Sequence, residues 1–366
     1  MNEHYRPTPG TPMEDLDTPC LIIDMDDLDN NMDVIADTYR NRSAKLRGHA
    51  KNHKTPAIAH RQIRRGGTVG GVCAAKVSEA EVMVHGGIPS VFITSEIIEP
   101  MKIDRLCALA DQAEMLVACD QANNARDLSK GAQARGVEVG VVIELETGLA
   151  RCGVRDTDEG VALAKEIASL PGLRFRGVMS HQTILDMPDR EDRAVEAART
   201  IKGVIDLKDA IESVGISIDI VSTGETWSYD VAADIPGVTE IQGGSYLMME
   251  THYSYMTEFH YAGKILTTII STPRPGVAIG DAGVRAVSSL SGMPTVFDRP
   301  GVTVENMDSD HSVFKVDPAA SLKVGDQVLL IPAQQDAMVS RWDRFIGLRG
   351  GKVEVVWDIQ ARGCHN

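Results

Sequence analysis

Between about residues 20 and 265 the chain alternates short, β-rich apolar runs with polar stretches that have helical spacing, such as Ser78–His85 and Arg190–Val214. Repeated strand-then-helix units predict a parallel sheet, and about eight of them predict a (β/α)8 barrel. A doubly wound sheet is the alternative, but no Gly-x-Gly-x-x-Gly turn follows the first run to support it. The expected strands are Leu21–Ile23, the segment leading into Lys51, Thr68–Val72, Ser90–Thr94, Glu114–Ala118, Val139–Glu144, Arg174–Met179 and Ser217–Val221.

The pattern changes after about residue 265, where helical spacing is absent and β-rich runs are separated by Gly, Pro and Asp turns. This pattern predicts a second, all-β domain after the barrel. The runs are Ile265–Ser271, Val302–Val304, Gln327–Ile331 and Lys352–Trp357.

The composition excludes several classes of protein. The chain has 52 Asp and Glu against 37 Lys and Arg, a net charge of −15, and no basic stripe, so we expect no nucleic-acid partner. No apolar run has the length of a membrane span, and the polar, proline-containing segment Met1–Asp17 does not resemble a signal peptide. The six cysteines form no Cys-x-x-Cys pair, so we expect free thiols and a cytoplasmic location.

A cationic cluster, Leu46–Lys54, holds two lysines, two histidines and an arginine within nine residues. Clusters of this kind are usually solvated loop surface. In so acidic a chain, however, the cluster favours contact with an anion, such as a phosphorylated cofactor or a carboxylate substrate. Cationic neighbours also lower the pKa of a lysine amine, which is one way a lysine becomes able to form a Schiff base.

The pattern Arg-x-His-x-Lys-x-His-Lys, preceded by Thr-Pro-x-Leu-x-x-Asp, resembles the D-threonine aldolase/D-serine dehydratase family. These are pyridoxal-phosphate (PLP) enzymes with the alanine-racemase-like fold, fold type III, and they include the D-3-hydroxyaspartate aldolases. The resemblance runs from Thr18 to about Gly363. It implies that Lys51 carries the cofactor, that the N-terminus adds a strand to the β domain, and that two subunits pair head to tail. We therefore expect a homodimer, with a PLP-binding barrel at 28–264 and a β domain formed by 1–27 plus 265–366.

Catalytic residues of such barrels lie just after the carboxyl ends of strands. Arg151 lies in a Gly-x-x-Arg-Cys-Gly-Val match after the strand ending at Glu144, and the resemblance places it beside the cofactor ring. His181 follows the strand ending at Met179, where the family usually has a tyrosine. An imidazole there can stack or donate a hydrogen bond, so we include His181 among the catalytic candidates.

Two glycine- and hydroxyl-containing segments, Ser222–Thr226 and Gln242–Tyr246, follow the last two barrel strands. Backbone N–H groups and side-chain hydroxyls in such loops can hold a phosphate. Glu225 stands where the family often has a small residue, and Trp227 is also unusual, so the substrate side of the pocket is expected to differ. The cofactor candidates are Ser222, Gly224, Thr226, Gly244 and Ser245.

The resemblance also implies a metal site after the strand Gln327–Ile331. Asp336 occupies the family's Cys or Asp position, whereas Gln334 replaces its histidine. Carboxylate and amide oxygens suit hard ions such as Mg²⁺ or Mn²⁺. Either a weakly held hard ion persists here, or the site is lost and a histidine, His252 or His311, takes over its task.

The resemblance implies a lyase that cleaves a D-3-hydroxy amino acid, of the D-threonine or D-3-hydroxyaspartate type, to glycine and an aldehyde with help from a divalent metal. A dehydratase and a racemase are alternatives within the same fold. A non-catalytic PLP-binding protein is a further alternative, but such proteins lack the β domain.

Overall fold

The computed structural model describes residues 5–183 and 186–366, which form two compact units. The barrel unit contains Ile35–Lys51, Thr55–Gly244 and Cys364–Asn366. The β unit contains the residues up to Val34, Asn52–Lys54 and Ser245–Gly363. These units overlap the expected barrel and β domain, whose exact boundaries stay a prediction. No helix in the described ranges is long and apolar enough to cross a membrane. All six cysteines are free thiols.

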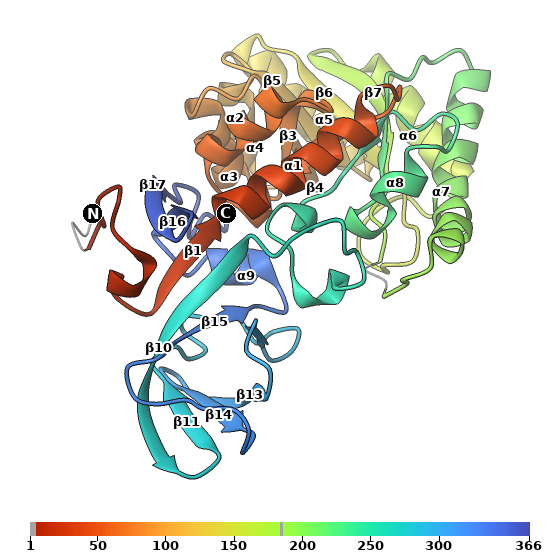
Figure 1. The fold of residues 1–366 in the computed structure, drawn as a ribbon. Helices are drawn as coiled ribbons and strands as arrows, with labels where there is room; N and C mark the ends of the chain where they lie inside the picture. The colour runs from red at the N-terminus through yellow and green to blue at the C-terminus, as the bar shows by residue number, and fades with distance from the viewer. Residues whose placement is uncertain (1–4, 184–185) are drawn as a thin grey trace. The chain divides into compact units, whose positions relative to one another are not determined.

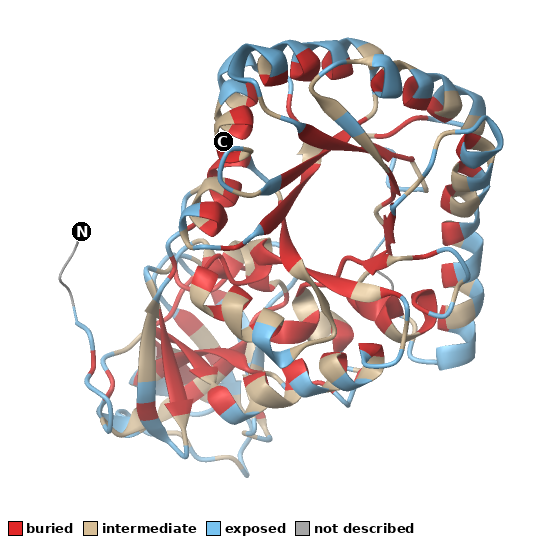
Figure 2. Cartoon of the chain, turned by 90° about the horizontal axis from the view of Figure 1, so that it is seen from above, coloured by how far each residue is buried: buried red, intermediate tan, exposed pale blue. Residues whose placement is uncertain are grey.

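The barrel unit is a closed, parallel, eight-stranded barrel, as the alternating pattern predicted. Seen from above in Figure 2, the buried strands form a ring, and the surrounding helices turn their exposed faces outward. The strands are β2 (Lys45–His49), β3 (Thr68–Ala74), β4 (Ser90–Glu96), β5 (Glu114–Cys119), β6 (Val139–Glu144), β7 (Leu173–Met179), β8 (Ile220–Thr223) and β9 (Glu240–Ile241). The helices are α2 (Pro56–Arg65), α3 (Val77–His85), α4 (Pro100–Leu109), α5 (Ala122–Arg135), α6 (Thr157–Ser169), α7 (Arg190–Ser213) and α8 (Tyr229–Ala232).

The barrel strands are apolar because most of their residues are buried. Phe92, Leu116, Val142 and Met179 come from four strands and belong to one fully buried cluster. Strands covered on both faces need not alternate apolar with polar residues, which explains the continuous apolar runs in the sequence. Gly177 allows β7 to approach β8 closely, because a Cβ at this residue would lie 1.8 Å from the carbonyl oxygen of Ile220.

An ion pair spans the seam where β2 meets β9. The Arg47 guanidinium donates to both carboxylate oxygens of Glu240, at 2.8 and 2.7 Å, and both side chains are buried. Burial alone would lower the pKa of Arg47, but the hydrogen bonds and charge of Glu240 outweigh it and raise that pKa. The cationic cluster was expected to contact an anion. For Arg47 that anion is the carboxylate of Glu240, in the protein itself.

The β unit is built on one nine-stranded sheet, in the order β13-β14-β11-β10-β1-β16-β17, with β15 pairing β10 and β12. Its strands are β1 (Cys20–Asp24), β10 (Gly263–Arg274), β11 (Val277–Gly280), β12 (Thr295–Phe297), β13 (Val302–Met307), β14 (Ser312–Val316), β15 (Gln327–Ile331), β16 (Arg344–Arg349) and β17 (Lys352–Asp358). The N-terminal β1 pairs with β10 and β16, as Figure 1 shows, so the N-terminus does supply a strand. Helix α1 (Met25–Tyr39) leads from this unit into the barrel.

Three local details differ from what the sequence pattern predicted. The C-terminal region is not purely β, because α9 (Gln335–Val339) follows β15; a helix of five residues is too short to show a period. Of the expected strand Ser217–Val221 only Ile220 and Val221 are in β8, since pairing with β7 starts at Gly177 and Ile220. The two residues of β9 were missed as a strand because they form too short a run.

Candidate active site

Lys51 lies in a single 3-10 turn, Ala50–Asn52, directly after β2. Its backbone N–H donates to Nδ1 of His49, whose Nε2 lies 3.3 Å from the hydroxyl of Thr94 on β4. The N–H of His49 donates to the carbonyl of Gly243, which follows β9. The side-chain amine of Lys51 makes no hydrogen bond or ion pair with any residue that the structure describes. It is thus available to react with a carbonyl compound.

Arg151 is held by a tight loop after β6. The Glu146 carboxylate accepts hydrogen bonds from the N–H groups of Gly148 and Ala150, at 2.6 and 2.8 Å. At Gly153 a Cβ would lie 2.5 Å from the backbone nitrogen of Glu146, so a larger residue would open the loop. The Arg151 side chain is 54% exposed, and its Nη2 lies 3.5 Å from Oε1 of Glu144.

Four acidic groups gather behind Arg151, and we call them the acid cluster: Glu96, Asp120, Glu144 and Cys152. Burial, then the charge and hydrogen bond of Glu96, raise the pKa of Glu144 to about 8. Burial and the same carboxylate raise the pKa of the Cys152 thiol to about 11. The possible ligand atoms of Glu96, Asp120 and Cys152 lie within 4.8 Å of one another. Because Cys152 hydrogen-bonds Glu96 and Asp120 accepts from the Gly153 N–H, we assign no ion to them.

His181 lies after β7 in a polar setting. Its Nδ1 lies 3.9 Å from the carboxylate of Glu225, which follows β8, and its Nε2 lies 3.5 Å from the carbonyl of Thr94. The Thr147 hydroxyl donates to the His181 carbonyl at 2.8 Å. Two of the residues that depart from the pattern implied by the resemblance, His181 and Glu225, are therefore neighbours.

Trp227 is fully buried, and its indole N–H donates to the carbonyl of Thr183. It therefore links the segment after β8 to the segment after β7. This contact is a structural reason for its size.

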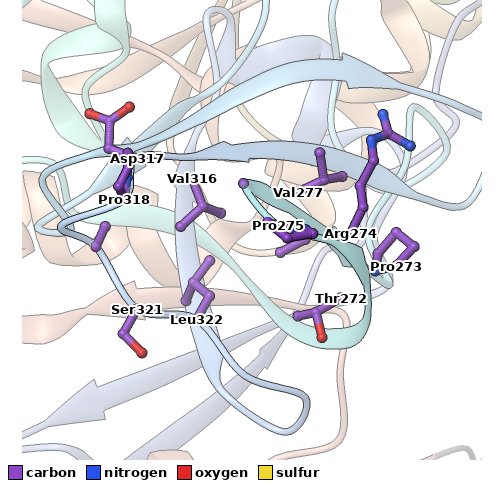
Figure 3. A pocket seen from close by; sticks show the side chains of 13 residues that line it. Thr272, Pro273, Arg274, Pro275, Val277, Val316, Asp317, Pro318, Ser321 and Leu322 are labelled. Carbon is purple, nitrogen blue, oxygen red and sulfur yellow. The ribbon is translucent and has the colours of Figure 1, made fainter.

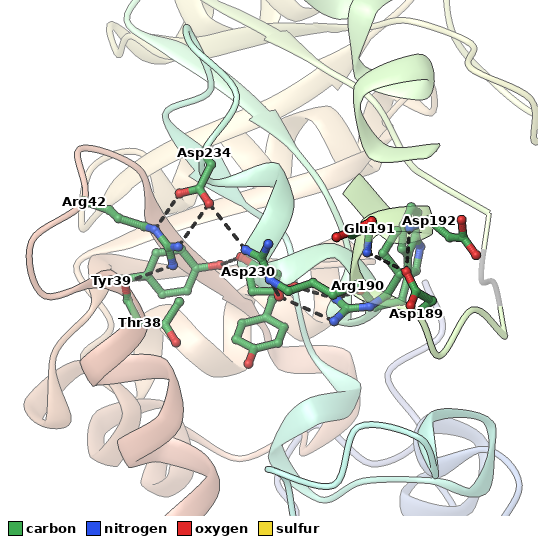
Figure 4. A network of polar contacts seen from close by, with 12 residues as sticks. Thr38, Tyr39, Arg42, Asp189, Arg190, Glu191, Asp192, Asp230 and Asp234 are labelled. Carbon is green, nitrogen blue, oxygen red and sulfur yellow. Dashed lines mark hydrogen bonds and ion pairs between the residues drawn. The ribbon is translucent and has the colours of Figure 1, made fainter. Parts of the chain in front are cut away.

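A network of ion pairs anchors the helices that follow these two strands (Figure 4). Asp230 on α8 accepts from Arg190 and Arg193 at the start of α7, and Arg193 also donates to the Trp227 carbonyl at 2.8 Å. Asp234 pairs with Arg42 and Arg190. The network fixes the far ends of the two segments that carry His181 and Glu225.

The expected phosphate-binding residues divide between the two units. Ser222 and Thr226 are buried in the barrel unit, where Ser222 accepts a hydrogen bond from Gln242 at 3.0 Å. Gly224 has a φ of +81°, a left-handed conformation that favours glycine. Gly244 is the last residue of that stretch of the barrel unit, and Ser245 is the first of the β unit.

The expected metal segment lies in the β unit, where a buried carboxylate, Glu250, organises it. Glu250 accepts from the Ser245 hydroxyl at 3.2 Å and from the N–H of Gln335 at 2.8 Å. Asp336 accepts from the N–H of Ala337, and Gln334 accepts from the Ser291 hydroxyl at 3.4 Å. Within the described ranges no three His, Cys, Asp or Glu side chains converge at this segment. The donor set here is one carboxylate and one amide.

The two candidate histidines of this unit have different settings. His252 lies in the turn Thr251–Tyr253, and the N–H of Thr251 donates to the carbonyl of Pro332, just before the metal segment. His311 is exposed in the turn between β13 and β14, where its carbonyl accepts from the N–H of Asp308.

The β unit also has a cavity of about 630 Å³ between the β10–β11 hairpin and the segment that follows β14 (Figure 3). Its charged side chains are Arg274 and Asp317, and its lining contains no histidine, cysteine or lysine. The lining therefore offers one carboxylate but none of the lysine, histidine or cysteine side chains found at the strand ends of the barrel.

Seven sequence candidates lie in the barrel unit at or just after the carboxyl ends of its strands: Lys51, Arg151, His181, Ser222, Gly224, Thr226 and Gly244. Ser245, His252, Gln334 and Asp336 lie in the β unit. The sequence reasoning missed Glu96, Asp120, Glu144 and Glu250 as candidates. The first three lie at or one residue beyond the ends of β4, β5 and β6, so the strand-end rule could have found them.

Two family models match the chain, "Alanine racemase, N-terminal domain" over residues 23–251 and "Putative serine dehydratase domain" over 262–348. The 3-hydroxy-D-aspartate aldolase of Paracoccus denitrificans (strain Pd 1222) is 36% identical, over 97% of this chain and 94% of that protein. The chain belongs to the D-threonine aldolase/D-serine dehydratase family. This family member is also 32% identical to a D-threonine aldolase of Arthrobacter sp., over 97% of this chain and 95% of that one. The crystal structure of D-threonine aldolase from Filomicrobium marinum matches with a TM-score of 0.94 and 36% identity, over 98% of this chain and 100% of that chain.

As a member of this family, the protein is a PLP-dependent enzyme of the aldolase type. The residues present fit that cofactor. Lys51 offers an amine without a competing partner among the described residues, and Arg151 keeps half of its guanidinium side chain exposed. Gly224 supplies the left-handed backbone that a phosphate-binding turn uses.

Proposed function

We propose that this enzyme cleaves a D-3-hydroxy amino acid, of the D-threonine or D-3-hydroxyaspartate type, to glycine and an aldehyde. The proposal is carried by one observation: the Lys51 amine stands unpaired among the described residues at the end of β2, in a chain similar over nearly its whole length to two kinds of D-amino-acid aldolase. For a 3-hydroxyaspartate the aldehyde product is glyoxylate.

In the proposed reaction the amine of Lys51 would hold the cofactor. Its phosphate would be held by Ser222, Gly224, Thr226, Gly244 and Ser245, and Arg151 would orient its ring through exposed N–H groups. The cofactor, when bound, supplies the electron sink that makes cleavage of the Cα–Cβ bond possible. The protein must remove the proton of the 3-hydroxyl group as that bond breaks and return a proton to Cα.

We assign the removal of the hydroxyl proton to a histidine. In the barrel unit His181 faces Glu225 at 3.9 Å, and a carboxylate beside an imidazole stabilises the protonated form that a general base reaches. His252, next to the metal segment in the β unit, is the second candidate. Comparing H181Q with H252Q separates the two, because the variant that lacks the base loses kcat over the whole pH range.

We further propose that Gln334 and Asp336 would hold a hard divalent ion weakly, and that such an ion would supply Lewis-acid assistance to the ionisation of a hydroxyl group. One carboxylate oxygen of Asp336 accepts a hydrogen bond from the N–H of Ala337, and its other oxygen accepts no hydrogen bond from a described residue.

The enzyme is also proposed to act as a homodimer, since a partner's β domain would exclude water from the barrel mouth. If sedimentation showed a monomer that is fully active, the homodimer proposal would be wrong.

The test is incubation of PLP-loaded protein with D- and L-threonine and with both 3-hydroxyaspartates, followed by product analysis. Glycine plus an aldehyde from the D-substrates alone supports the proposal. Ammonia plus a keto acid would instead identify a dehydratase, and inversion at Cα without cleavage would identify a racemase.

A further inference from the structure

The two carboxylate oxygens of Glu144 have different surroundings. Oε1 lies 3.5 Å from Nη2 of Arg151, whereas Oε2 is buried and meets no hydrogen-bond donor among the described residues. The Glu144 side chain is only 4% exposed. Oε1 of Glu96 is likewise buried without a donor. Two ionised carboxylates in this arrangement would be strongly unfavourable.

One proton between the two carboxyl groups removes the conflict. Glu96 and Arg151 act on Glu144, Glu144 acts on Cys152, and Asp120 lies near Glu96 and Cys152. Burial comes first among the effects on the pKa of Glu144, and the charge and hydrogen bond of Glu96 follow. Together they outweigh Arg151 and raise that pKa to about 8, so that at neutral pH Glu144 is predominantly a neutral carboxyl group.

We propose that Glu144 is a positioning residue that acts through Arg151: its Oε2–H donates to Glu96, and its Oε1 accepts from the Arg151 guanidinium. The proposal rests on the proposed function, because it takes Arg151 as the residue that orients the cofactor ring. A neutral carboxyl group orients the guanidinium without cancelling its charge. The other N–H groups, on a side chain 54% exposed, then keep their full attraction for an anionic oxygen of the cofactor.

Loss of the Glu144 proton changes this arrangement. A full carboxylate at Oε1 competes with the cofactor for the guanidinium, and two adjacent carboxylates repel each other. The electronic state of the bound cofactor should therefore change with the protonation of Glu144. Two further groups lie nearby: Cys152 hydrogen-bonds Glu96, and Asp120 accepts a hydrogen bond from the Gly153 N–H. Among the described residues, neither group makes a hydrogen bond to Arg151.

The first experiment detects the proton in the protein without cofactor, by infrared difference spectroscopy between about pH 6 and pH 10. Ordinary Asp and Glu are already ionised at about pH 6. We expect the carbonyl band of a protonated carboxyl group that disappears with a midpoint near pH 8. The band should be absent in E144Q and unchanged in E114Q. The E114Q variant is a matched control, because Glu114 is a barrel glutamate that pairs with Arg176 but lies at the start of β5, whereas Glu144 lies at the end of β6. A wild-type spectrum without the band, or E144Q with it, overturns the proposal.

The second experiment follows the visible absorbance of the PLP-loaded protein against pH. The wild type should show a transition near pH 8 that is lost in E144Q, retained in E114Q and moved to lower pH in E96Q, where the repelling charge is gone. E144A should weaken cofactor binding by about tenfold, the lower end for losing a supporting hydrogen bond. A transition that stays near pH 8 in both E144Q and E96Q overturns the role of Glu144. If E144Q does not fold, E96Q alone decides.

The outcomes separate this proposal from the proposed function. A PLP-loaded protein that titrates as described but yields no glycine and aldehyde leaves Glu144 in its role and removes the aldolase. If the protein cleaves the substrate but its visible absorbance titrates unchanged in E144Q and E96Q, the aldolase proposal stands and the role of Glu144 is removed.

Discussion

The Arg151 guanidinium lies 3.5 Å from the buried carboxyl group of Glu144, and both residues come from one short stretch at the end of β6. Arg151, which we propose orients the cofactor ring, is thus supported by a group whose pKa is raised to about 8. The support is local in sequence, but its raised pKa comes from burial and from Glu96 on β4.

Glu144 should make stability depend on pH. Its pKa is about 8 in the folded chain against 4.5 as the ordinary value, so between these two pH values the unfolded chain loses this proton while the folded chain keeps it. The favourable contribution is complete below pH 4.5 and is lost as pH rises toward about 8. Relative to E144Q, the wild type should therefore lose at most about 1.4 kcal/mol of unfolding free energy per pH unit in this window. Urea denaturation of both proteins across this range measures it; parallel curves would contradict the raised pKa.

Lys51→Ala should abolish covalent attachment of the cofactor, because the Lys51 amine is the one expected to react. The measurement is borohydride reduction of PLP-loaded protein followed by peptide mapping, with Lys54→Gln as the comparison. Wild type and Lys54→Gln should carry the label on the peptide containing Lys51. A label that survives in Lys51→Ala, or that maps to Lys54, shows that the assignment is wrong.

Glu240→Ala should destabilise the barrel strongly, since it leaves the buried Arg47 charge without its bidentate partner. The expected loss in the free energy of unfolding is about 3–5 kcal/mol. Glu166→Ala is the control, because it removes a partly exposed ion pair with Arg126 and should cost no more than about 1 kcal/mol. Replacing Arg47 by Met and Glu240 by Leu together should recover most of the loss in chemical denaturation. A double variant as unstable as Glu240→Ala would mean that the pair is needed for its hydrogen bonds rather than for charge balance.

The metal segment should bind weakly, because it offers one carboxylate and one amide. Purified protein is expected to contain little metal, with activity restored by added Mn²⁺ or Mg²⁺. Gln334→His should tighten Mn²⁺ binding by more than about tenfold, since an imidazole adds a stronger ligand. Isothermal titration of the metal-free protein measures the affinity. Full activity after exhaustive chelation, together with a silent Asp336→Ala, would show that this member works without a metal.

Glu225→Gln should lower kcat, because the imidazole of His181 loses a carboxylate at 3.9 Å that would stabilise the positive charge formed when a general base accepts a proton. The expected loss in kcat is about ten- to a hundredfold, less than general-base catalysis contributes as a whole. Asp230→Asn is a useful comparison, since it loosens the same region through Arg190 and Arg193 without touching His181. An unchanged kcat in Glu225→Gln would argue against His181 as the base.

The sequence by itself determined most of the helices and strands, and the strand ends after which the candidate residues lie. Hydrophobic period and chain order were enough to predict a barrel followed by β strands, and Lys51, Arg151 and His181 all lie where strand ends were expected. These are local properties, because each depends on a few neighbouring residues. Elements too short to show a period, such as β9 and α9, were missed for the same reason.

Only the tertiary structure decided which side chains meet. Glu96 acquires its effect on Glu144 because the barrel brings together the ends of β4 and β6, the two strands that flank β5. Arg47 meets Glu240 because β2 pairs with β9. Glu250 joins Ser245 to Gln335 in the same way. The sequence of a strand determines which side chains lie at its end, but closure of the barrel determines which side chains from other strands they contact. The charge of a buried group depends on those partners, so the protonation of Glu144 could not be read from the sequence.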